Sequence, residues 1–292
     1  MSAILPHMPM NEPMPHAKQN APIGIFDSGI GGLSVALEIA RYLPQERILY
    51  YADTANVPYG PRDDQNIREL TAHAVEWLYR QGCKVAVVAC NTASAFSLDH
   101  LREHYGEKFP IIGLVPALKP AVLQTQSKSV AVLATPATFR GKLIKDVIKN
   151  FAEPLGVNVS TVTCLDLVPL VESGQQNSQQ SHLLLQQLLD PIVDHGVDFL
   201  VLGCTHYPFL KDAIQHVYGD KLSLVDSGFA VARQTSRILI KNDLVSNQFE
   251  MDQPRLACFV SGQNAKELKP IIKCLIDSEI SWTVENIVEK FN

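Results

Sequence analysis

Two cysteines occupy matching positions in a pattern that occurs twice in the chain. The segment GCKVAVVACNTAS at 82–94 aligns with GVDFLVLGCTHYP at 196–208, so that their first glycines coincide and Cys90 coincides with Cys204. Each copy predicts a buried strand that ends in a small residue and a cysteine, just before a helix start. Chance similarity over so short a segment is the alternative. The repeat predicts two similar halves that face each other, with one cysteine in each.

A thiol between a strand and a helix N-terminus can act as a base. The helix dipole and the free N–H groups there favour the thiolate, so we expect a lowered pKa for Cys90 and Cys204. One such cysteine would suggest a nucleophile, as in amidases or cysteine hydrolases. Two on opposing halves can invert a stereocentre, because one removes a proton from the α-carbon while the other supplies one to the opposite face.

The neighbours of these two cysteines are polar, whereas the other cysteines lack such a setting. Asn91 and Thr92 follow Cys90, while Thr205 and His206 follow Cys204. These neighbours could hold a carboxylate and an ammonium group, or could serve only as helix caps. The remaining cysteines are expected to be inert and apolar in character; they are Cys83, Cys164, Cys258 and Cys274. A thiol-redox protein is disfavoured because no CxxC pair is present, and no Cys/His spacing predicts a metal site.

A glycine-rich segment, DSGIGG at 27–32, follows the first predicted strand. Its glycines would let backbone N–H groups approach an anion, although the spacing is not that of a GxGxxG loop. Asp27 would repel a phosphate, but it could orient an ammonium group or accept a proton from a thiol. Two further aspartates at strand ends, Asp53 and Asp226, are interpreted as caps of the following helices.

Short apolar runs alternate with amphipathic stretches along most of the chain. The predicted strands are 23–27, 48–52, 84–89, 110–115, 129–134, 157–162, 198–202, 222–226 and 256–260. Helical periodicity is clear at 64–81 and 181–195, and the polar stretch 173–181 predicts a surface loop. This alternation is typical of an α/β fold with mostly parallel sheets, in which ligands bind beyond the carboxyl ends of the strands.

The composition predicts a globular protein without a membrane span. The 292 residues are 46% apolar and carry a formal charge of −5, and no apolar run reaches the roughly 18 residues that a span needs. The absence of a dense Lys/Arg run weighs against a nucleic-acid partner. Residues 1–22 contain five prolines and four methionines without a signal-peptide pattern, and they are expected to form a flexible tail.

Five motifs, taken in order, resemble those of the glutamate racemases within the aspartate/glutamate racemase superfamily. They are FDSGIGGLSV (26–35), YADTANVPYG (51–60), VVACNTAS (87–94), LGCTHYP (202–208) and VDSG (225–228). No single motif is decisive, but the ordered set is specific. It covers the chain from Ile23 to about Arg237.

The resemblance implies roles for residues at matching positions. Cys90 would deprotonate D-glutamate and Cys204 would deprotonate L-glutamate. Asp27 would assist the first cysteine, and His206, helped by Glu172, the second. Substrate contacts are expected from Asp27, Ser28, Tyr59, Gly60, Asn91, Thr92, Thr138, Thr205 and His206, with Thr138 in a segment that follows the family only loosely.

Other enzymes and binding functions are weighed against this resemblance. Aspartate racemases usually have glutamate at the position of His206, so the histidine favours glutamate as substrate. Decarboxylase and hydantoin-type relatives typically keep one of the paired cysteines or lack the NVPYG loop, and both features are present here. Some glutamate racemases also modulate DNA gyrase, but no basic patch supports direct contact with DNA.

The resemblance also implies an architecture, partners and a cellular role. Two pseudo-symmetric α/β domains are expected, at 23–113 plus 226–292 and at 114–225, with the active site in the cleft between them. The family uses neither pyridoxal phosphate nor a metal, and it usually forms homodimers. It supplies D-glutamate for peptidoglycan, and hence for cell wall and cell shape, in the cytoplasm. Relatives with an N-terminal extension can require a uridine-linked peptidoglycan precursor as activator.

Overall fold

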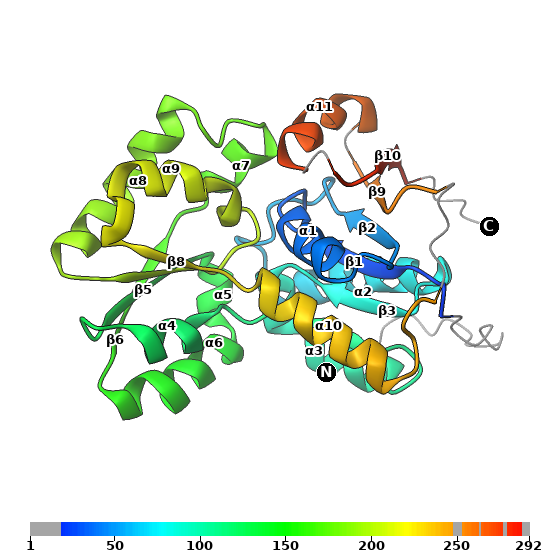
Figure 1. The fold of residues 1–292 in the computed structure, drawn as a ribbon, viewed down its shortest axis with the longest axis horizontal. Helices are drawn as coiled ribbons and strands as arrows, with labels where there is room; N and C mark the ends of the chain where they lie inside the picture. The colour runs from blue at the N-terminus through cyan, green and yellow to red at the C-terminus, as the bar shows by residue number, and fades with distance from the viewer. Residues whose placement is uncertain (1–18, 248–252, 263, 277–278, 288–292) are drawn as a thin grey trace.

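The chain folds into two parallel sheets, each covered by helices on both faces (Figure 1). The computed structural model describes residues 19–247, 253–262, 264–276 and 279–287. Most of the expected N-terminal tail, residues 1–18, lies outside the described residues. The α/β fold with parallel sheets, predicted from the alternation of apolar runs and amphipathic stretches, is confirmed.

The first sheet has six strands in the order β10-β9-β2-β1-β3-β4. They are β1 (Ile23–Asp27), β2 (Ile48–Ala52), β3 (Val85–Val88), β4 (Ile111–Gly113), β9 (Leu256–Val260) and β10 (Trp282–Asn286). The central strand β1 is apolar until its last residue and fully buried, as expected for a strand covered on both faces. The sequence analysis missed β10, because this edge strand is only partly buried and three residues of its sequence, WTVEN, are polar.

The second sheet has four strands in the order β6-β5-β7-β8. They are β5 (Ser129–Ala134), β6 (Asn158–Thr163), β7 (Phe199–Leu202) and β8 (Ser223–Val225). Across both sheets, all nine strands predicted from the sequence are present, with bounds within two residues of those expected.

Four helix layers bury the two sheets. On the first sheet, one face packs against α1 (Leu33–Tyr42), α10 (Gly228–Lys241) and α11 (Ala265–Leu275), and the other against α2 (Asp64–Arg80) and α3 (Asn91–Tyr105). On the second, one face packs against α7 (Leu167–Glu172), α8 (Gln179–Asp194) and α9 (Lys211–Tyr218), and the other against α4 (Leu118–Gln124) and α6 (Lys142–Val147). Shorter pieces are α5 (Pro136–Arg140), a π-helical turn at Ile148–Ala152, and 3₁₀ turns at Glu153–Leu155, Tyr207–Leu210 and Gly219–Lys221.

The polar stretch predicted as a loop at 173–181 is partly helical. Helix α8 begins at Gln179, and the Ser178 hydroxyl caps it by accepting a hydrogen bond from the Ser181 N–H group at 3.2 Å. The prediction was therefore wrong for the last three residues of this stretch. A serine cap starts a helix irrespective of the low complexity around it.

The repeat seen in the sequence corresponds to a repeated structural unit. Gly82 (φ 76°) ends α2 and leads into β3, and Gly196 (φ 80°) ends α8 and leads into β7. Glycine is suited to both positions because the left-handed backbone carries little penalty without a Cβ atom. Cys90 and Cys204 thus follow the two matching strands, at the carboxyl ends where ligands of parallel sheets bind.

The chain crosses between the sheets twice, after β4 and after β8. The two crossing segments touch, since the Ser227 hydroxyl donates a hydrogen bond to the Val115 carbonyl at 2.7 Å. The carboxyl ends of β1 and β7 meet at the interface, where the Thr205 hydroxyl donates to the carboxylate of Asp27, the last residue of β1, at 3.0 Å. The two sheets therefore face each other through their strand ends.

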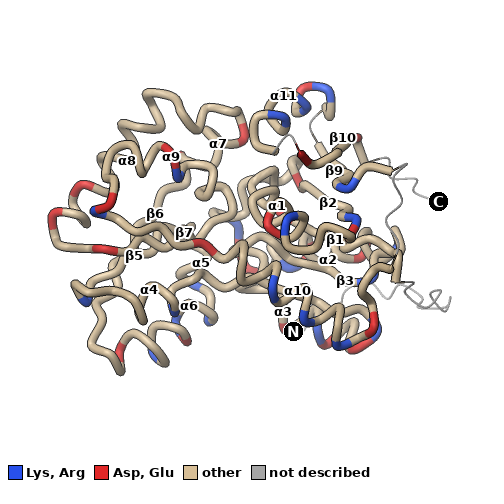
Figure 2. Tube along the Cα trace, viewed as in Figure 1, with Lys and Arg blue, Asp and Glu red and all other residues tan. Residues whose placement is uncertain are grey.

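Along the described part of the chain, basic and acidic residues occur around both sheets. Figure 2 shows Lys/Arg and Asp/Glu residues intermixed on the outer helices and loops of both. Within the described ranges, none of the helices is long and apolar enough to cross a membrane.

A buried ion pair lies at the opposite end of the first sheet. The Lys84 ammonium group donates to Glu46 at 2.5 Å and to the Gln19 carbonyl at 2.6 Å, and both charged side chains are essentially unexposed. We expect Lys84→Met to lower the free energy of unfolding by about 3–5 kcal/mol, because Glu46 would stay buried without its cation. Urea unfolding measures this loss.

The matched control is Glu38→Gln, which breaks the exposed pair with Arg41. This change should cost less than about 1 kcal/mol, because water screens an exposed pair. A loss for Lys84→Met no larger than that of the control would contradict the role of the buried pair.

Candidate active site

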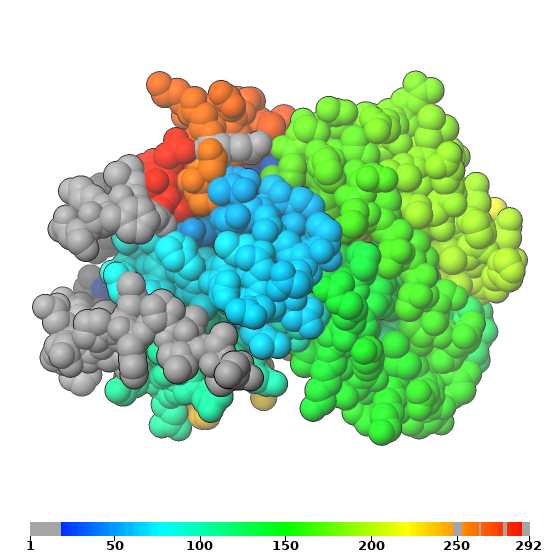
Figure 3. Space-filling model, turned by 180° about the vertical axis from the view of Figure 1, so that it is seen from behind, coloured from blue at the N-terminus to red at the C-terminus, as the bar shows by residue number. Residues whose placement is uncertain are grey.

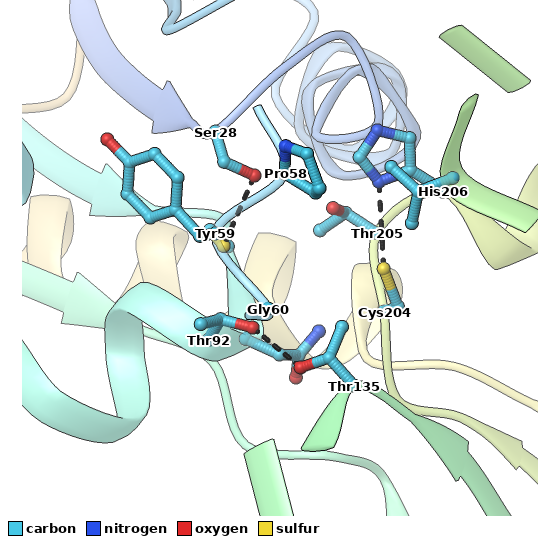
Figure 4. Close-up of a pocket in the computed structure, with 12 residues that line it drawn as sticks. Ser28, Pro58, Tyr59, Gly60, Thr92, Thr135, Cys204, Thr205 and His206 are labelled. Carbon is cyan, nitrogen blue, oxygen red and sulfur yellow. Dashed lines mark hydrogen bonds between the residues drawn. The ribbon is translucent and has the colours of Figure 1, made fainter. Parts of the chain in front are cut away.

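A small cavity lies between the two halves, at the strand ends. It is lined by Ser28, Pro58, Tyr59, Gly60, Cys90, Asn91, Thr92, Thr135, Val168, Cys204, Thr205 and His206 (Figure 4). Nine of these residues are ones that the sequence analysis selected. Asp27, Glu172 and Thr138 lie behind the lining, and Pro58, Thr135 and Val168 were not foreseen. Both cysteines of the repeat border the same cavity.

Cys90 is the N-cap of α3. Its sulfur accepts a hydrogen bond from the Ala93 N–H group at 3.4 Å, and its thiol donates to the Ser28 hydroxyl at 3.6 Å. The cap is thus the cysteine itself, whereas Asn91 and Thr92 occupy the first turn of the helix. Burial, reinforced by the negative charge of Asp27, raises the pKa of Cys90 to about 12. The expectation of a lowered pKa was wrong for Cys90, because burial outweighs the helix terminus.

Cys204 stands at the start of a hydrogen-bonded chain. Its sulfur lies 3.6 Å from Nδ1 of His206, and Nε2 of His206 lies 2.6 Å from Oε1 of Glu172. Burial disfavours the charged ring, but hydrogen bonds and charge interactions with Cys204 and Glu172 prevail and raise the pKa of His206 well above its usual value. The imidazolium form can donate one proton to each partner.

The segment after Cys204 does not continue directly into an α-helix. His206 precedes the 3₁₀ turn Tyr207–Leu210, and α9 begins only at Lys211. The helix expected at this point is therefore delayed by one turn. The two copies of the repeat differ most in this turn.

Asp27 is fully buried at the end of β1 and joins the two halves. Its carboxylate accepts hydrogen bonds from the Gly29 N–H group at 3.1 Å and from the Thr205 hydroxyl at 3.0 Å. Burial raises the pKa of Asp27 to about 6, although the positive charge of His206 opposes the shift. Asp27 influences Cys90 through its charge, and its hydrogen-bond donors include the backbone of Gly29 and Gly32 and the Thr205 hydroxyl.

The glycine-rich loop packs against side chains of the second half. The Ile30 N–H group donates to Oε1 of Glu172 at 2.8 Å, so the anion that this loop approaches is a carboxylate of the protein itself. A Cβ atom on Gly29 would lie 2.0 Å from that oxygen, and one on Gly31 would lie 2.4 Å from Nδ1 of His206. The glycines allow the loop to approach these two side chains.

Three threonines form a buried hydroxyl cluster across the interface. The Thr135 hydroxyl lies 2.8 Å from that of Thr92 and 3.0 Å from that of Thr138. Thr135 lines the cavity and caps α5, whereas Thr138 stands behind it. Thr135 could have been found from its position after β5 and before Pro136, which is typical of an N-cap.

The two strand-end aspartates behave differently. Asp226 accepts a hydrogen bond at 2.7 Å from the Gly228 N–H group, where α10 begins, and pairs with Lys211. Asp53 caps no helix, contrary to its interpretation as a helix cap. It accepts a hydrogen bond from the Tyr59 hydroxyl at 2.6 Å, and Figure 4 shows the Tyr59 ring directed away from the other labelled side chains.

The cavity lining offers hydrogen-bonding groups that the protein leaves unused. Among the described residues, no acceptor is bonded to the backbone N–H groups of Tyr59, Gly60, Asn91, Thr92, Thr205 and His206. The buried side-chain oxygen of Asn91 likewise has no donor in this part of the chain. Buried polar groups without a partner destabilise a protein, so these groups fit a ligand with carboxylates and a hydrogen-bond donor. In the described ranges, no cluster of His, Cys, Asp or Glu could hold a metal ion.

The chain matches known proteins over most of its length. The family model for Asp/Glu/Hydantoin racemases matches residues 28–235. Glutamate racemase of Deinococcus radiodurans is 56% identical over 231 residues, which cover 79% of each chain.

Two crystal structures share the fold over 92% of this chain and 98% of their own. Glutamate racemase isoform RacE1 from Bacillus anthracis has a TM-score of 0.78 and 29% identity. Escherichia coli glutamate racemase, in complex with L-glutamate and the activator UDP-MurNAc-ala, has a TM-score of 0.77 and 32% identity. The chain therefore belongs to the Asp/Glu/Hydantoin racemase family and is an amino-acid racemase similar to the glutamate racemases.

Proposed function

We propose that this racemase interconverts L- and D-glutamate by proton transfer between the α-carbon and the two cysteines, without a cofactor. The observation that carries the proposal is that Cys90 and Cys204, from opposite halves, line one cavity. Inversion needs an acid and a base on opposite faces of the α-carbon, with their roles exchanged in the reverse direction. Two thiols that alternate between thiol and thiolate meet this requirement.

The unused polar groups of the lining suit glutamate. Its two carboxylates can accept hydrogen bonds from the free backbone N–H groups at Tyr59 and Gly60, at the start of α3, and at Thr205 and His206. Its ammonium group can donate to the unpartnered side-chain oxygen of Asn91. The hydroxyls of Ser28, Thr92 and Thr205 complete the polar lining, with Thr138 supporting it through Thr135.

The electrostatics of the cavity suggest how a turnover starts. The raised pKa of Cys90 keeps this thiol protonated, ready to donate. The His206 imidazolium, held by Glu172, stabilises a negative charge on the adjacent Cys204 sulfur. We propose that Cys204 removes the α-proton of L-glutamate while Cys90 donates to the opposite face, and that the reverse reaction exchanges these roles. In this proposal the negative charge of Asp27 favours the thiol form of Cys90, and its carboxylate orients the Thr205 hydroxyl.

Closure of two domains over the substrate fits this chemistry. We propose domains at 23–113 plus 226–292 and at 114–225. The contacts between them include those of Asp27 with Thr205 and of Ile30 with Glu172. Excluding water would strengthen the electrostatic stabilisation of a carbanion-like transition state.

The proposed substrate suggests a cellular role. A racemase that makes D-glutamate would supply peptidoglycan synthesis in the cytoplasm, and thereby support cell wall and cell shape. We propose a homodimer as the working form. A uridine-linked peptidoglycan precursor is the candidate activator, because the similar E. coli enzyme was solved with UDP-MurNAc-ala.

The test is incubation with L-glutamate in D₂O without added cofactor. Chiral chromatography should show D-glutamate, and NMR should show deuterium at its α-carbon, since the proton delivered comes from an exchangeable thiol. A parallel incubation with the uridine-linked precursor tests the activator. If neither incubation yields racemisation or α-hydrogen exchange, the proposal fails.

The acidic limb of the pH profile should report Asp27. With a pKa of about 6, Asp27 is roughly nine-tenths ionised at pH 7 and nine-tenths protonated at pH 5. Protonation removes the charge that accepts from Gly29 and Thr205, so we expect kcat/KM to fall as the pH decreases through about 6. Asp27→Asn should remove this limb and lower kcat/KM at pH 7. An unchanged limb in the variant would assign the titration to another group.

A further inference from the structure

Asp53 is a buried carboxylate outside the cavity whose side-chain partners are all neutral. It follows β2 and accepts hydrogen bonds from the Tyr59 hydroxyl at 2.6 Å, from the Ser261 hydroxyl at 2.7 Å, and from the Asn56 amide at 3.1 Å. Asp53 therefore links the side chains of Tyr59, Ser261 and Asn56 to the end of β2 by hydrogen bonds.

Ser261 brings the C-terminal part of the chain into this cluster. It follows β9, its N–H group donates to the Ala52 carbonyl at 3.1 Å, and its hydroxyl accepts from the Ala55 N–H group at 3.0 Å. The next residue, Gly262, donates to the Thr54 hydroxyl at 3.2 Å, and a Cβ atom on it would lie 2.5 Å from Cα of Ala55. The turn after β9 is thus hydrogen-bonded to the turn after β2 and packs closely against it.

The supported segment, residues 54–60, carries part of the cavity lining. Pro58, Tyr59 and Gly60 line the cavity, and the backbone N–H groups of the last two donate to no described residue. Gly60 also abuts the second half, since a Cβ atom on it would lie 2.8 Å from Leu165 and 3.1 Å from Thr135. In Figure 3 the light-blue surface after β2 lies directly against the green surface of that half.

The side chain of Tyr59 serves as the anchor of this segment. Its ring is buried against Phe26, with centroids 6.1 Å apart, and its hydroxyl reaches Asp53. Because the Tyr59 side chain is fixed at both its ring and its hydroxyl, it restricts the position of the Tyr59–Gly60 backbone at the cavity. Loss of the Asp53 bonds would free that backbone without removing any group that lines the cavity.

We propose that Asp53 and Ser261 are positioning residues that hold the Tyr59–Gly60 backbone for the substrate, so that the turn after β9 contributes to substrate affinity. This inference rests on the proposed function and extends it to the C-terminal part of the chain. Ser261 lies beyond residues 28–235, where the family match ends. Neither residue lines the cavity.

The test compares Asp53→Asn and Ser261→Ala with the wild type. An asparagine keeps one acceptor oxygen where the carboxylate has two, so the hydroxyl that faces the new NH₂ group must reverse its hydrogen bond or lose it. Backbone N–H groups bind substrate in both the ground and the transition state, so we expect KM for L- and D-glutamate to rise roughly tenfold while kcat changes less than about threefold. Ser261→Thr, which keeps the hydroxyl, should restore a KM close to that of the wild type.

Calorimetric titration with glutamate provides a second readout that does not depend on turnover. The apparent Kd should rise by the same factor as KM in Asp53→Asn and Ser261→Ala. The double variant should show less than the product of the two single effects, because both changes disrupt one hydrogen-bonded cluster.

Asp198→Asn is the matched control. The Asp198 carboxylate also accepts three hydrogen bonds, from the Thr125 hydroxyl and from the N–H groups of Gln126 and Ser127, at the end of the second sheet opposite its carboxyl edge. This variant should lose thermal stability without a change in KM. An equal rise in KM for the control, or a folded Asp53→Asn with wild-type KM and Kd, overturns the inference. A wild type that does not racemise glutamate overturns the proposed function instead.

Discussion

Replacement of either cavity cysteine by serine is expected to lower kcat for glutamate racemisation at least about 100-fold, the contribution typical of a positioned acid or base. The proposed mechanism uses both sulfur atoms in each turnover, so Cys90→Ser and Cys204→Ser should each impair both directions. The equilibrium constant between enantiomers is one, which requires kcat/KM for L- and D-glutamate to fall by the same factor. Polarimetry or chiral chromatography from each enantiomer measures these losses.

Cys83→Ser is the control for loss of a buried thiol. Cys83 is packed in the core beside α2, where burial raises its pKa to about 12, but it does not line the cavity. This variant should keep near wild-type kcat, with only its stability lowered. Full racemisation by Cys90→Ser or Cys204→Ser would contradict the two-cysteine mechanism.

Gly31→Ala is expected to lower kcat roughly 100-fold without adding or removing any polar group. The new Cβ atom would lie 2.4 Å from Nδ1 of His206, the atom that contacts the Cys204 sulfur. The ring must move or the halves must separate, and a displacement of about 1 Å at a reacting group can cost a factor of about 100. Steady-state kinetics at saturating glutamate measures this effect.

Gly228→Ala serves as the control for adding a methyl group at a tightly packed glycine. Its Cβ atom would lie 2.9 Å from Cγ of Glu38 and 3.0 Å from Oδ1 of Asp226, and both are side-chain atoms that can shift by a few tenths of an ångström. We expect close to wild-type kcat in this variant. A Gly31→Ala enzyme with undiminished kcat would show that the position of His206 is not needed for turnover.

Much of the fold could be predicted because buried parallel strands are nearly continuous apolar runs. The segments VAVV in β3 and FLVL in β7 could be recognised as strands for this reason. The edge strand β10 was missed because three of its five residues are polar and the strand is only partly buried. The start of α8 was missed because the Ser/Gln-rich composition of 173–181 favoured a loop and the capping role of Ser178 was not recognised.

Most residues that line the cavity could also be predicted from the sequence. The repeat places Cys90 and Cys204 after matching strands, and parallel strands bring their carboxyl ends to one edge of a sheet. Thr135 was overlooked, although its position after a strand and before proline is an N-cap signal. Its role depends on Thr92, which lies far away in the sequence.

The sequence by itself determined which residues can do the chemistry and on which strands they lie, because periodicity and strand ends are local properties. Only the tertiary structure decided their electrostatics and their contacts. Burial reversed the expected pKa shift of Cys90. The Glu172 carboxylate forms hydrogen bonds with the Ile30 N–H group and with His206. Desolvation and long-range hydrogen bonds depend on segments that meet only when the two halves pack together, so no local pattern contains them.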